Sequence, residues 1–337
     1  MKNRLINIAI SLITTVLCII LLGLISTFLI KNKGKENNQI FNSIDWDNKD
    51  INDVPSPRNW SNISTIRGTD KTYTVKINGQ GLRDYEYGLK KPENSIRIAA
   101  VGDSTTFGVG VNLEDTYVKQ LEKILNKNCS KKIEVINFGA SGASTINELE
   151  LIQRKVLLYK PDIILLEMDN NDSSVIEQIK KVDPLSDAII LKIKNSNYEV
   201  SKWFKQKLEF YLYYKYRKQL TSEDHYNNIV KPFNVIKDIS KENNIKLVAV
   251  SYYDVPHNET YPKVLQYVKK SGVPLLDLFD TKFSKLSYQE KFSNPKLDKD
   301  GNPTDSHPNK YGSQIMAKEI SKFLENLEIL DFKKLCL

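Results

Sequence analysis

A serine stands at the end of a predicted strand, in a setting that suits nucleophilic chemistry. Ser104 lies in the run Gly102-Asp103-Ser104, directly after the apolar segment Ile96–Val101. Gly102 permits a tight turn, and the unpaired N–H groups at the start of the next helix favour negative charge. An oxyanion that forms beside Ser104 would therefore be stabilised. The competing interpretation is a serine that caps a helix.

A carboxylate and an imidazole stand two positions apart near the C-terminus. Asp305 and His307 lie in the run Asp305–Asn309, just before a helical pattern. A carboxylate that holds an imidazole in one tautomer lets the other ring nitrogen take a proton from a serine. The sequence thus predicts His307 as the base for Ser104 and Asp305 as its orienting group. The competing interpretation is two polar residues in a turn.

Two further segments after predicted strands offer hydrogen-bond donors. Gly142 offers a backbone N–H where a side chain would obstruct, and Asn171 offers an amide N–H. Together with the N–H of Ser104 they would form an oxyanion hole of three donors. Asparagine-rich turns are common in a chain so rich in asparagine, so each segment alone says little. All four motifs in this order, each at the end of an element, are informative.

The elements that must position these residues alternate along the chain from residue 96 onward. Five short apolar runs are typical of parallel strands covered on both faces: Ile96–Val101, Ile133–Phe138, Asp162–Met168, Lys246–Tyr252 and Pro274–Leu278. Helical patterns lie between and after them, at 114–128, 145–159, about 200–244, 259–270 and 309–327. This alternation predicts an α/β fold with a doubly wound parallel sheet, whose functional loops follow the carboxyl ends of the strands.

The order of these motifs resembles the SGNH (GDSL-like) hydrolase superfamily over about residues 73–327, and the segment Asn78–Asp84 is similar to a bacterial subgroup of it. The resemblance implies a flavodoxin-like sheet of about five strands with helices on both faces. It also implies hydrolysis of carboxylic esters without a metal or other cofactor. The implied roles are Ser104 as nucleophile, His307 as base, Asp305 as its orienting group, and Ser104, Gly142 and Asn171 as oxyanion donors.

Two positions depart from the family pattern. Asp169 replaces the usual glycine before Asn171, which puts a carboxylate near the oxyanion hole, and one residue rather than two separates Asp305 from His307.

The preferred function is a serine esterase that acts on O-acyl groups, above all acetyl, of cell-surface glycans or lipids. An O-acyltransferase with the same three residues, served by a membrane-bound acyl donor, is an alternative. A catalytically inactive glycan-binding or assembly protein is another.

The N-terminus predicts a membrane anchor. Residues 5–30 carry no charge and are almost wholly apolar, longer than the roughly 20 residues that a span requires and without a small-residue cleavage site. Residues 1–4 would be a cytoplasmic tail and residues 31–70 a linker, which is polar and holds Pro55 and Pro57. Residues 71–330 would form the catalytic domain outside the cell membrane, with residues 175–245 as a candidate helical cap.

The composition narrows the remaining classes of partner. Apolar residues make up 40% and charged residues 27% of the 337, which is typical of a globular protein. The net charge of +8 comes from lysines that are mixed with acids along the chain, so no nucleic-acid partner is predicted. The three cysteines form no CxxC pair, so neither a zinc site nor a disulfide framework is indicated. His225 and His257 are not assigned to catalysis, although His257 follows the fourth predicted strand.

Overall fold

The computed structural model describes residues 60–66, 69–127, 131–173, 221–252, 260–297 and 303–327. The predicted anchor, most of the predicted linker and residues 175–220 of the predicted cap lie outside these ranges. Within them, no helix combines the length and the apolar character that a bilayer crossing needs.

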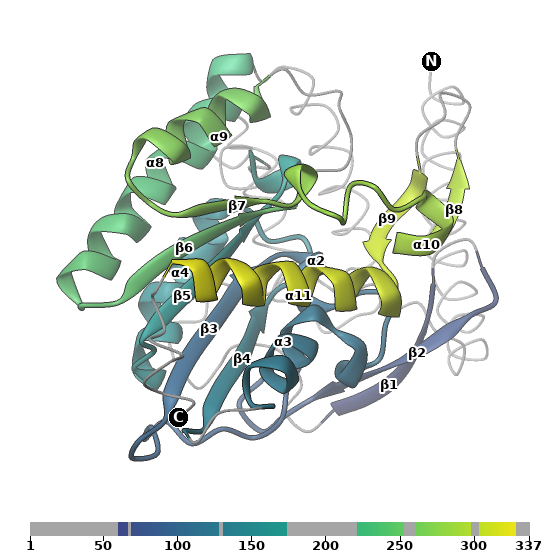
Figure 1. The fold of residues 1–337 in the computed structure, drawn as a ribbon, viewed down its shortest axis with the longest axis horizontal. Helices are drawn as coiled ribbons and strands as arrows, with labels where there is room; N and C mark the ends of the chain where they lie inside the picture. Colours follow the sequence, from purple (N-terminus) through teal and green to yellow (C-terminus); the bar gives the residue numbers. More distant parts are fainter. Residues whose placement is uncertain are drawn as a thin grey trace, which may run out of the picture. The chain divides into compact units, whose positions relative to one another are not determined.

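A five-stranded parallel sheet forms the centre of the described chain (Figure 1). The spatial order is β4-β3-β5-β6-β7, and every neighbouring pair is parallel. The strands are β3 (Ile96–Gly102), β4 (Ile133–Gly139), β5 (Ile163–Met168), β6 (Lys246–Ser251) and β7 (Leu275–Asp277). The predicted α/β fold with five parallel strands is confirmed. Because β3 lies between the next two strands of the chain, the loops that follow these three strands meet at one place.

Helices cover both faces of this sheet, and neighbouring residues of β3 point to opposite faces. Ile98 and Ala100 pack with α3 (Tyr117–Leu125) and α11 (Lys310–Asn326), which lie in front of the sheet in Figure 1. Ala99 and Val101 belong to the other core, whose helices are α4 (Thr145–Arg154), α8 (Ser222–Glu242) and α9 (Tyr261–Lys270). Helix α8, at the end of residues 175–245, packs in the layer that covers the sheet.

Two predicted helices are each divided by one residue. The pattern over 114–128 forms the 3-10 helix η1 (Leu113–Asp115) and then α3, because Thr116 adopts an extended backbone and its hydroxyl caps α3 at the N–H of Lys119. The pattern over 145–159 forms α4 and then η2 (Val156–Tyr159). The remaining short helices are α2 (Ser104–Phe107), η3 (Asn170–Ser173), η4 (Leu278–Asp280) and α10 (Tyr288–Lys291).

Two antiparallel ribbons accompany the sheet. The first pairs β1 (Trp60–Thr65) with β2 (Thr72–Ile77), so the end of the predicted linker is a strand. The sequence of β1 lacks an alternating apolar pattern. Strand β2 instead buries Tyr73, Val75 and Ile77 in a small core with Phe107. The second ribbon pairs β8 (Phe292–Leu297) with β9 (Pro303–Pro308), with irregular register.

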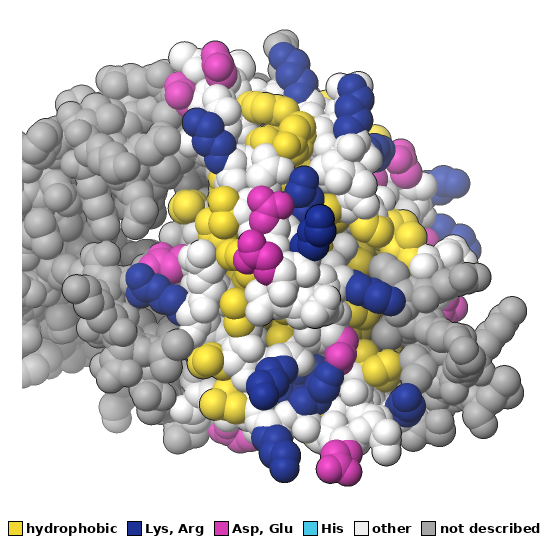
Figure 2. Space-filling model, turned by 90° about the vertical axis from the view of Figure 1, so that its left-hand side faces the viewer, with side chains coloured by type: hydrophobic (Ala, Val, Ile, Leu, Met, Phe, Trp, Pro, Cys, Tyr) yellow, Lys and Arg dark blue, Asp and Glu magenta, His cyan; other side chains and the backbone are white. Residues whose placement is uncertain are grey.

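The surface drawn in Figure 2 mixes charges of both signs. Aspartate and glutamate side chains lie among the lysine and arginine side chains, and hydrophobic side chains lie between them in small groups. On this face the excess of positive charge is thus spread out rather than gathered into one basic stripe.

Candidate active site

The serine hydroxyl stands on a one-turn helix at the carboxyl end of the central strand. Helix α2 begins at Ser104, and the Asp103 carboxylate caps it by accepting the N–H of Thr105 at 2.8 Å. Two glycines allow the surrounding chain to approach closely. A Cβ added to Gly102 would lie 2.3 Å from Thr106 Oγ1, and one added to Gly139 would lie 2.1 Å from the backbone N of Phe107. The β3–α2 turn therefore requires both glycines.

Ser104, His307 and Asp305 form a continuous hydrogen-bonded chain. Ser104 Oγ lies 2.9 Å from His307 Nε2, and His307 Nδ1 lies 2.5 Å from Asp305 Oδ1. With Nδ1–H donating to the carboxylate, Nε2 is left to accept the serine hydroxyl hydrogen. The Asp305 side chain is 4% exposed whereas the His307 side chain is 28% exposed. The carboxylate is thus enclosed, and the imidazole remains accessible.

The spacing of Asp305 and His307 follows from the strand on which they lie. Both belong to β9, and side chains two positions apart in a strand point to the same side. The sequence placed this pair in a segment before the last helix with a turn as one interpretation, and the structure shows a strand instead. In a strand a single intervening residue suffices, which explains the shorter spacing.

Contacts that the sequence analysis missed hold β9 in place. The hydroxyl of Tyr252, the residue directly after β6, donates to the carbonyl of Ser306, between the acid and the base. Asn309 caps α11 by accepting the N–H of Gly312 at 2.9 Å, and its amide donates to the carbonyl of Phe292 at 3.1 Å. These bonds fix β9 between the sheet and α11. In the sequence, Tyr252 is only the last residue of a predicted strand, and Asn309 only stands at the start of a predicted helix.

The Ser104 hydroxyl has a second acceptor within reach. Asp103 Oδ2 lies 3.2 Å from Ser104 Oγ, farther than His307 Nε2. A hydroxyl carries one hydrogen, so the shorter contact to the imidazole orients it for transfer to nitrogen.

The candidate oxyanion donors lie on loops that follow adjacent strands. The loop after β4 is joined to the end of β3 by a bond from Ala140 N–H to the carbonyl of Gly102 at 2.9 Å. Gly142, farther along this loop, has a φ of +80°, which favours glycine, and no atom lies within 4 Å of an added Cβ. Asn171 lies in η3, directly after β5, and its side chain is outside the described part. The strand order therefore directs these two loops toward α2.

A group of buried carboxyl groups lies behind the site. Glu148, Glu167 and Asp172 are almost fully buried, and Glu167 Oε2 accepts the Thr106 hydroxyl at 3.0 Å. Burial raises the pKa of each group well above its ordinary value, and the charges of neighbouring carboxylates add to this. Both carboxyl oxygens of Glu148 lack a hydrogen-bond partner within the described residues. The raised pKa values favour the protonated form of these three carboxyl groups.

The other histidines lie elsewhere. His225 belongs to α8, and its Nδ1 lies 2.7 Å from Ser173 Oγ rather than beside Ser104. His257 lies outside the described residues. Across the portion of the chain that the structure describes, no group of three or more His, Cys, Asp or Glu side chains is arranged to hold a metal ion.

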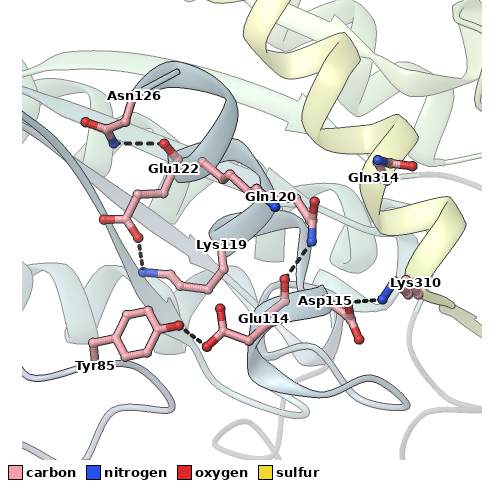
Figure 3. Close-up of a pocket in the computed structure, with 10 residues that line it drawn as sticks. Tyr85, Glu114, Asp115, Lys119, Gln120, Glu122, Asn126, Lys310 and Gln314 are labelled. Carbon is pink, nitrogen blue, oxygen red and sulfur yellow. Dashed lines mark hydrogen bonds and ion pairs between the residues drawn. The ribbon is translucent and has the colours of Figure 1, made fainter. Parts of the chain in front are cut away.

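A surface groove of about 640 Å³ lies between α3 and the start of α11 (Figure 3). The Tyr85 hydroxyl donates to Glu114 on one side, and Lys310 pairs with Asp115 at 3.0 Å on the other. None of the serine, histidine and aspartate of the hydrogen-bonded chain lines it. The groove is therefore separate from the candidate active site.

Comparisons with known proteins identify a family for this chain. A family model described as GDSL-like Lipase/Acylhydrolase matches residues 98–320. An acetylxylan esterase of Xylanibacter ruminicola is 31% identical over 110 residues, which are 29% of this chain and only 22% of that protein. The esterase EstA of Pseudoalteromonas sp. shares 16% identity over 70% of this chain and 99% of its own, with a TM-score of 0.43. A lipase/acylhydrolase of Enterococcus faecalis shares 18% identity over 69% and 96%, with a TM-score of 0.42.

Proposed function

Since the chain belongs to the GDSL-like lipase/acylhydrolase family, we propose that it is a serine esterase that removes small O-acyl groups, acetyl above all, from carbohydrate. The observation that carries this proposal is the chain of hydrogen bonds from Ser104 through His307 to Asp305. The partial similarity to an acetylxylan esterase supports acetyl groups on a glycan as the substrate class. Lipid esters are the second class.

The proposed reaction is a two-step acyl transfer. His307 Nε2 takes the hydroxyl proton as Ser104 Oγ attacks the ester carbonyl, and the resulting imidazolium is stabilised by the Asp305 carboxylate. The N–H groups of Ser104 and Gly142 and the amide of Asn171 hold the oxyanion. Collapse of the tetrahedral intermediate breaks the bond to the alcohol, which leaves with the proton from His307. Water then attacks the acyl-serine by the same steps and releases the acid.

We also propose that the enzyme is held at the cell membrane with its catalytic domain outside. The uncharged apolar run over residues 5–30 supports this placement. Fractionation of cells followed by protease treatment of intact cells tests it. Membrane association with a protease-sensitive domain is expected, whereas a protein found in the soluble fraction would contradict it.

Acetate release from acetylated xylo-oligosaccharides by the full-length protein tests the proposed activity. Wild type is expected to release acetate, and Ser104→Ala is expected to lose at least about 10⁴-fold in kcat. Deacetylation that depends equally on Ser104 but delivers acetyl to an added acceptor glycan would identify a transferase. No turnover of either these oligosaccharides or p-nitrophenyl esters would contradict the proposal.

A further inference from the structure

Arg83 lies behind α2, where it donates hydrogen bonds to four main-chain carbonyls. Its Nη1 donates to Phe107 O at 2.9 Å and to Gly108 O at 2.5 Å. Its Nη2 donates to Thr74 O at 3.0 Å and to Val111 O at 2.5 Å. The residue is 1% exposed. Two of these carbonyls are at the C-terminal end of α2, where unpaired carbonyls and the helix dipole favour a cation.

The aromatic rings beside this guanidinium add to its stabilisation. Its carbon lies 5.1 Å from the centre of the Phe107 ring and 5.6 Å from that of Tyr73. Burial lowers the pKa of Arg83 to about 10, so the side chain stays charged at neutral pH. Behind α2 there is thus a buried positive charge that is held by main-chain carbonyls and two aromatic rings.

The carbonyl of Ser104 is joined to the peptide that Arg83 holds. The N–H groups of Gly108 and Val109 both donate to Ser104 O at 3.0 Å, while Arg83 binds the carbonyl of Gly108. A four-residue helix has too few internal bonds to be stable by itself. A Cβ on Gly108, whose φ is +89°, would lie 3.0 Å from Arg83 Nη1. Thr116 Cγ2 would lie closer still, at 2.4 Å, so the turn at Gly108 is packed between Thr116 and the guanidinium.

The residue after Arg83 fixes the same segment to the sheet. Asp84 Oδ2 accepts the N–H of Asn137 in β4 at 2.6 Å, and Asp84 Oδ1 pairs with Lys119 at 2.7 Å. Lys119 also pairs with Glu122 at 2.9 Å (Figure 3). The Asn137 side chain in turn donates to the carbonyl of Thr106 in α2 at 2.9 Å. Arg83 thus contacts α2 directly, and Asp84 is linked to α2 through Asn137.

We propose that Arg83 is a positioning residue for Ser104, holding the end of α2 so that the serine hydroxyl stays in line with His307. This inference rests on the proposed esterase activity. Arg83 lies before residues 98–320, the part of the chain that matches the family model. A misplacement of about 1 Å at a reacting atom lowers a rate by about 10²-fold.

The test compares full-length Arg83→Met and Arg83→Lys with Arg97→Met. Arg97 is an equally buried arginine at the opposite end of β3, where it pairs with Glu134 at 2.7 Å. At a temperature where circular dichroism shows every variant folded, kcat and KM for p-nitrophenyl acetate and the rate of phosphonylation by a fluorophosphonate are measured. Arg83→Met is expected to lose about 10²-fold in kcat and in phosphonylation rate with little change in KM. Arg83→Lys is expected to recover part of this loss, and Arg97→Met to stay within threefold of wild type.

Amide hydrogen exchange provides a readout that needs no activity. The N–H groups of Gly108 and Val109 should lose protection in both Arg83 variants and keep it in Arg97→Met. Wild-type protection at these two sites in a folded Arg83 variant would overturn the inference, as would a kcat within threefold of wild type. If wild type itself is inactive and unlabelled, the esterase proposal fails. Loss of amide protection in the Arg83 variants would then show only that Arg83 holds α2. The inference that Arg83 positions a catalytic serine would be overturned in that case as well.

Discussion

His307 Nδ1 lies 2.5 Å from Asp305 Oδ1, and the two residues are neighbours on one side of strand β9. The contact fixes the imidazole so that Nε2 faces Ser104. The Asp305 side chain is enclosed, and an amide of the same shape would fit in its place. Because an amide N–H can donate to His307 Nδ1, it would favour the tautomer that carries the hydrogen on Nε2.

We therefore expect Asp305→Asn to lower kcat by about 10⁴-fold while KM changes little. Steady-state hydrolysis of p-nitrophenyl acetate measures both constants. Asp115→Asn, on the wall of the separate groove, is the matched control and should behave as wild type. A kcat for Asp305→Asn within tenfold of wild type would show that the carboxylate does not orient the base.

Asn171→Ala is expected to lower kcat by about 10²–10³-fold, because it removes one donor from the oxyanion while ground-state binding stays similar. The same assay gives the ratio, and Asn62→Ala, at a half-buried position of β1, serves as control. An unchanged kcat for Asn171→Ala would remove this residue from the oxyanion hole.

Gly139→Ala should destabilise the fold by about 1–3 kcal/mol, because its Cβ would lie 2.1 Å from the backbone N of Phe107. Urea denaturation followed by circular dichroism measures the free energy of unfolding. Gly88→Ala is the control, since its nearest atom is 3.6 Å from an added Cβ. Equal stability of the two variants would mean that the chain around α2 is looser than the structure shows.

The buried carboxyl group of Glu148 gives a stability change with a defined sign. Burial raises its pKa in the folded state above the unfolded-state value of about 4, so folding takes up a proton between these two values. The stabilising contribution is complete below about pH 4 and is lost as the pH rises toward the folded-state pKa. For one proton, the free energy of unfolding changes by up to about 1.4 kcal/mol per pH unit, and Glu148→Gln removes this dependence.

Thermal denaturation of wild type and Glu148→Gln between pH 4 and pH 8 checks this. The variant should gain stability relative to wild type as the pH rises, whereas the exposed Glu223→Gln should not. Parallel curves for Glu148→Gln and wild type would contradict a neutral Glu148 in the folded protein.

The sequence predicted the sheet because its strands are apolar runs of the right length, and it predicted the neighbourhood of Ser104 because each motif follows such a run. The ribbon that carries Asp305 and His307 was not predictable in this way, since β9 is polar and contains Pro303 and Pro308. Strand β1 has the same lack of an apolar pattern. Arg83 belongs to the segment Asn78–Asp84, which resembles a bacterial subgroup of the family, but its role depends on contacts with residues up to 28 positions away.

Covalent labelling of Ser104 tests the central claim most directly. The full-length protein, Ser104→Ala and His307→Ala are treated with a fluorophosphonate, and the modified residue is identified by mass spectrometry of peptides. The hydrogen-bonded geometry predicts one phosphonylated residue in wild type, Ser104, with no labelling of Ser104→Ala and labelling of His307→Ala slowed at least about 10³-fold. Labelling at another residue, or labelling of Ser104 that is independent of His307, would contradict the account.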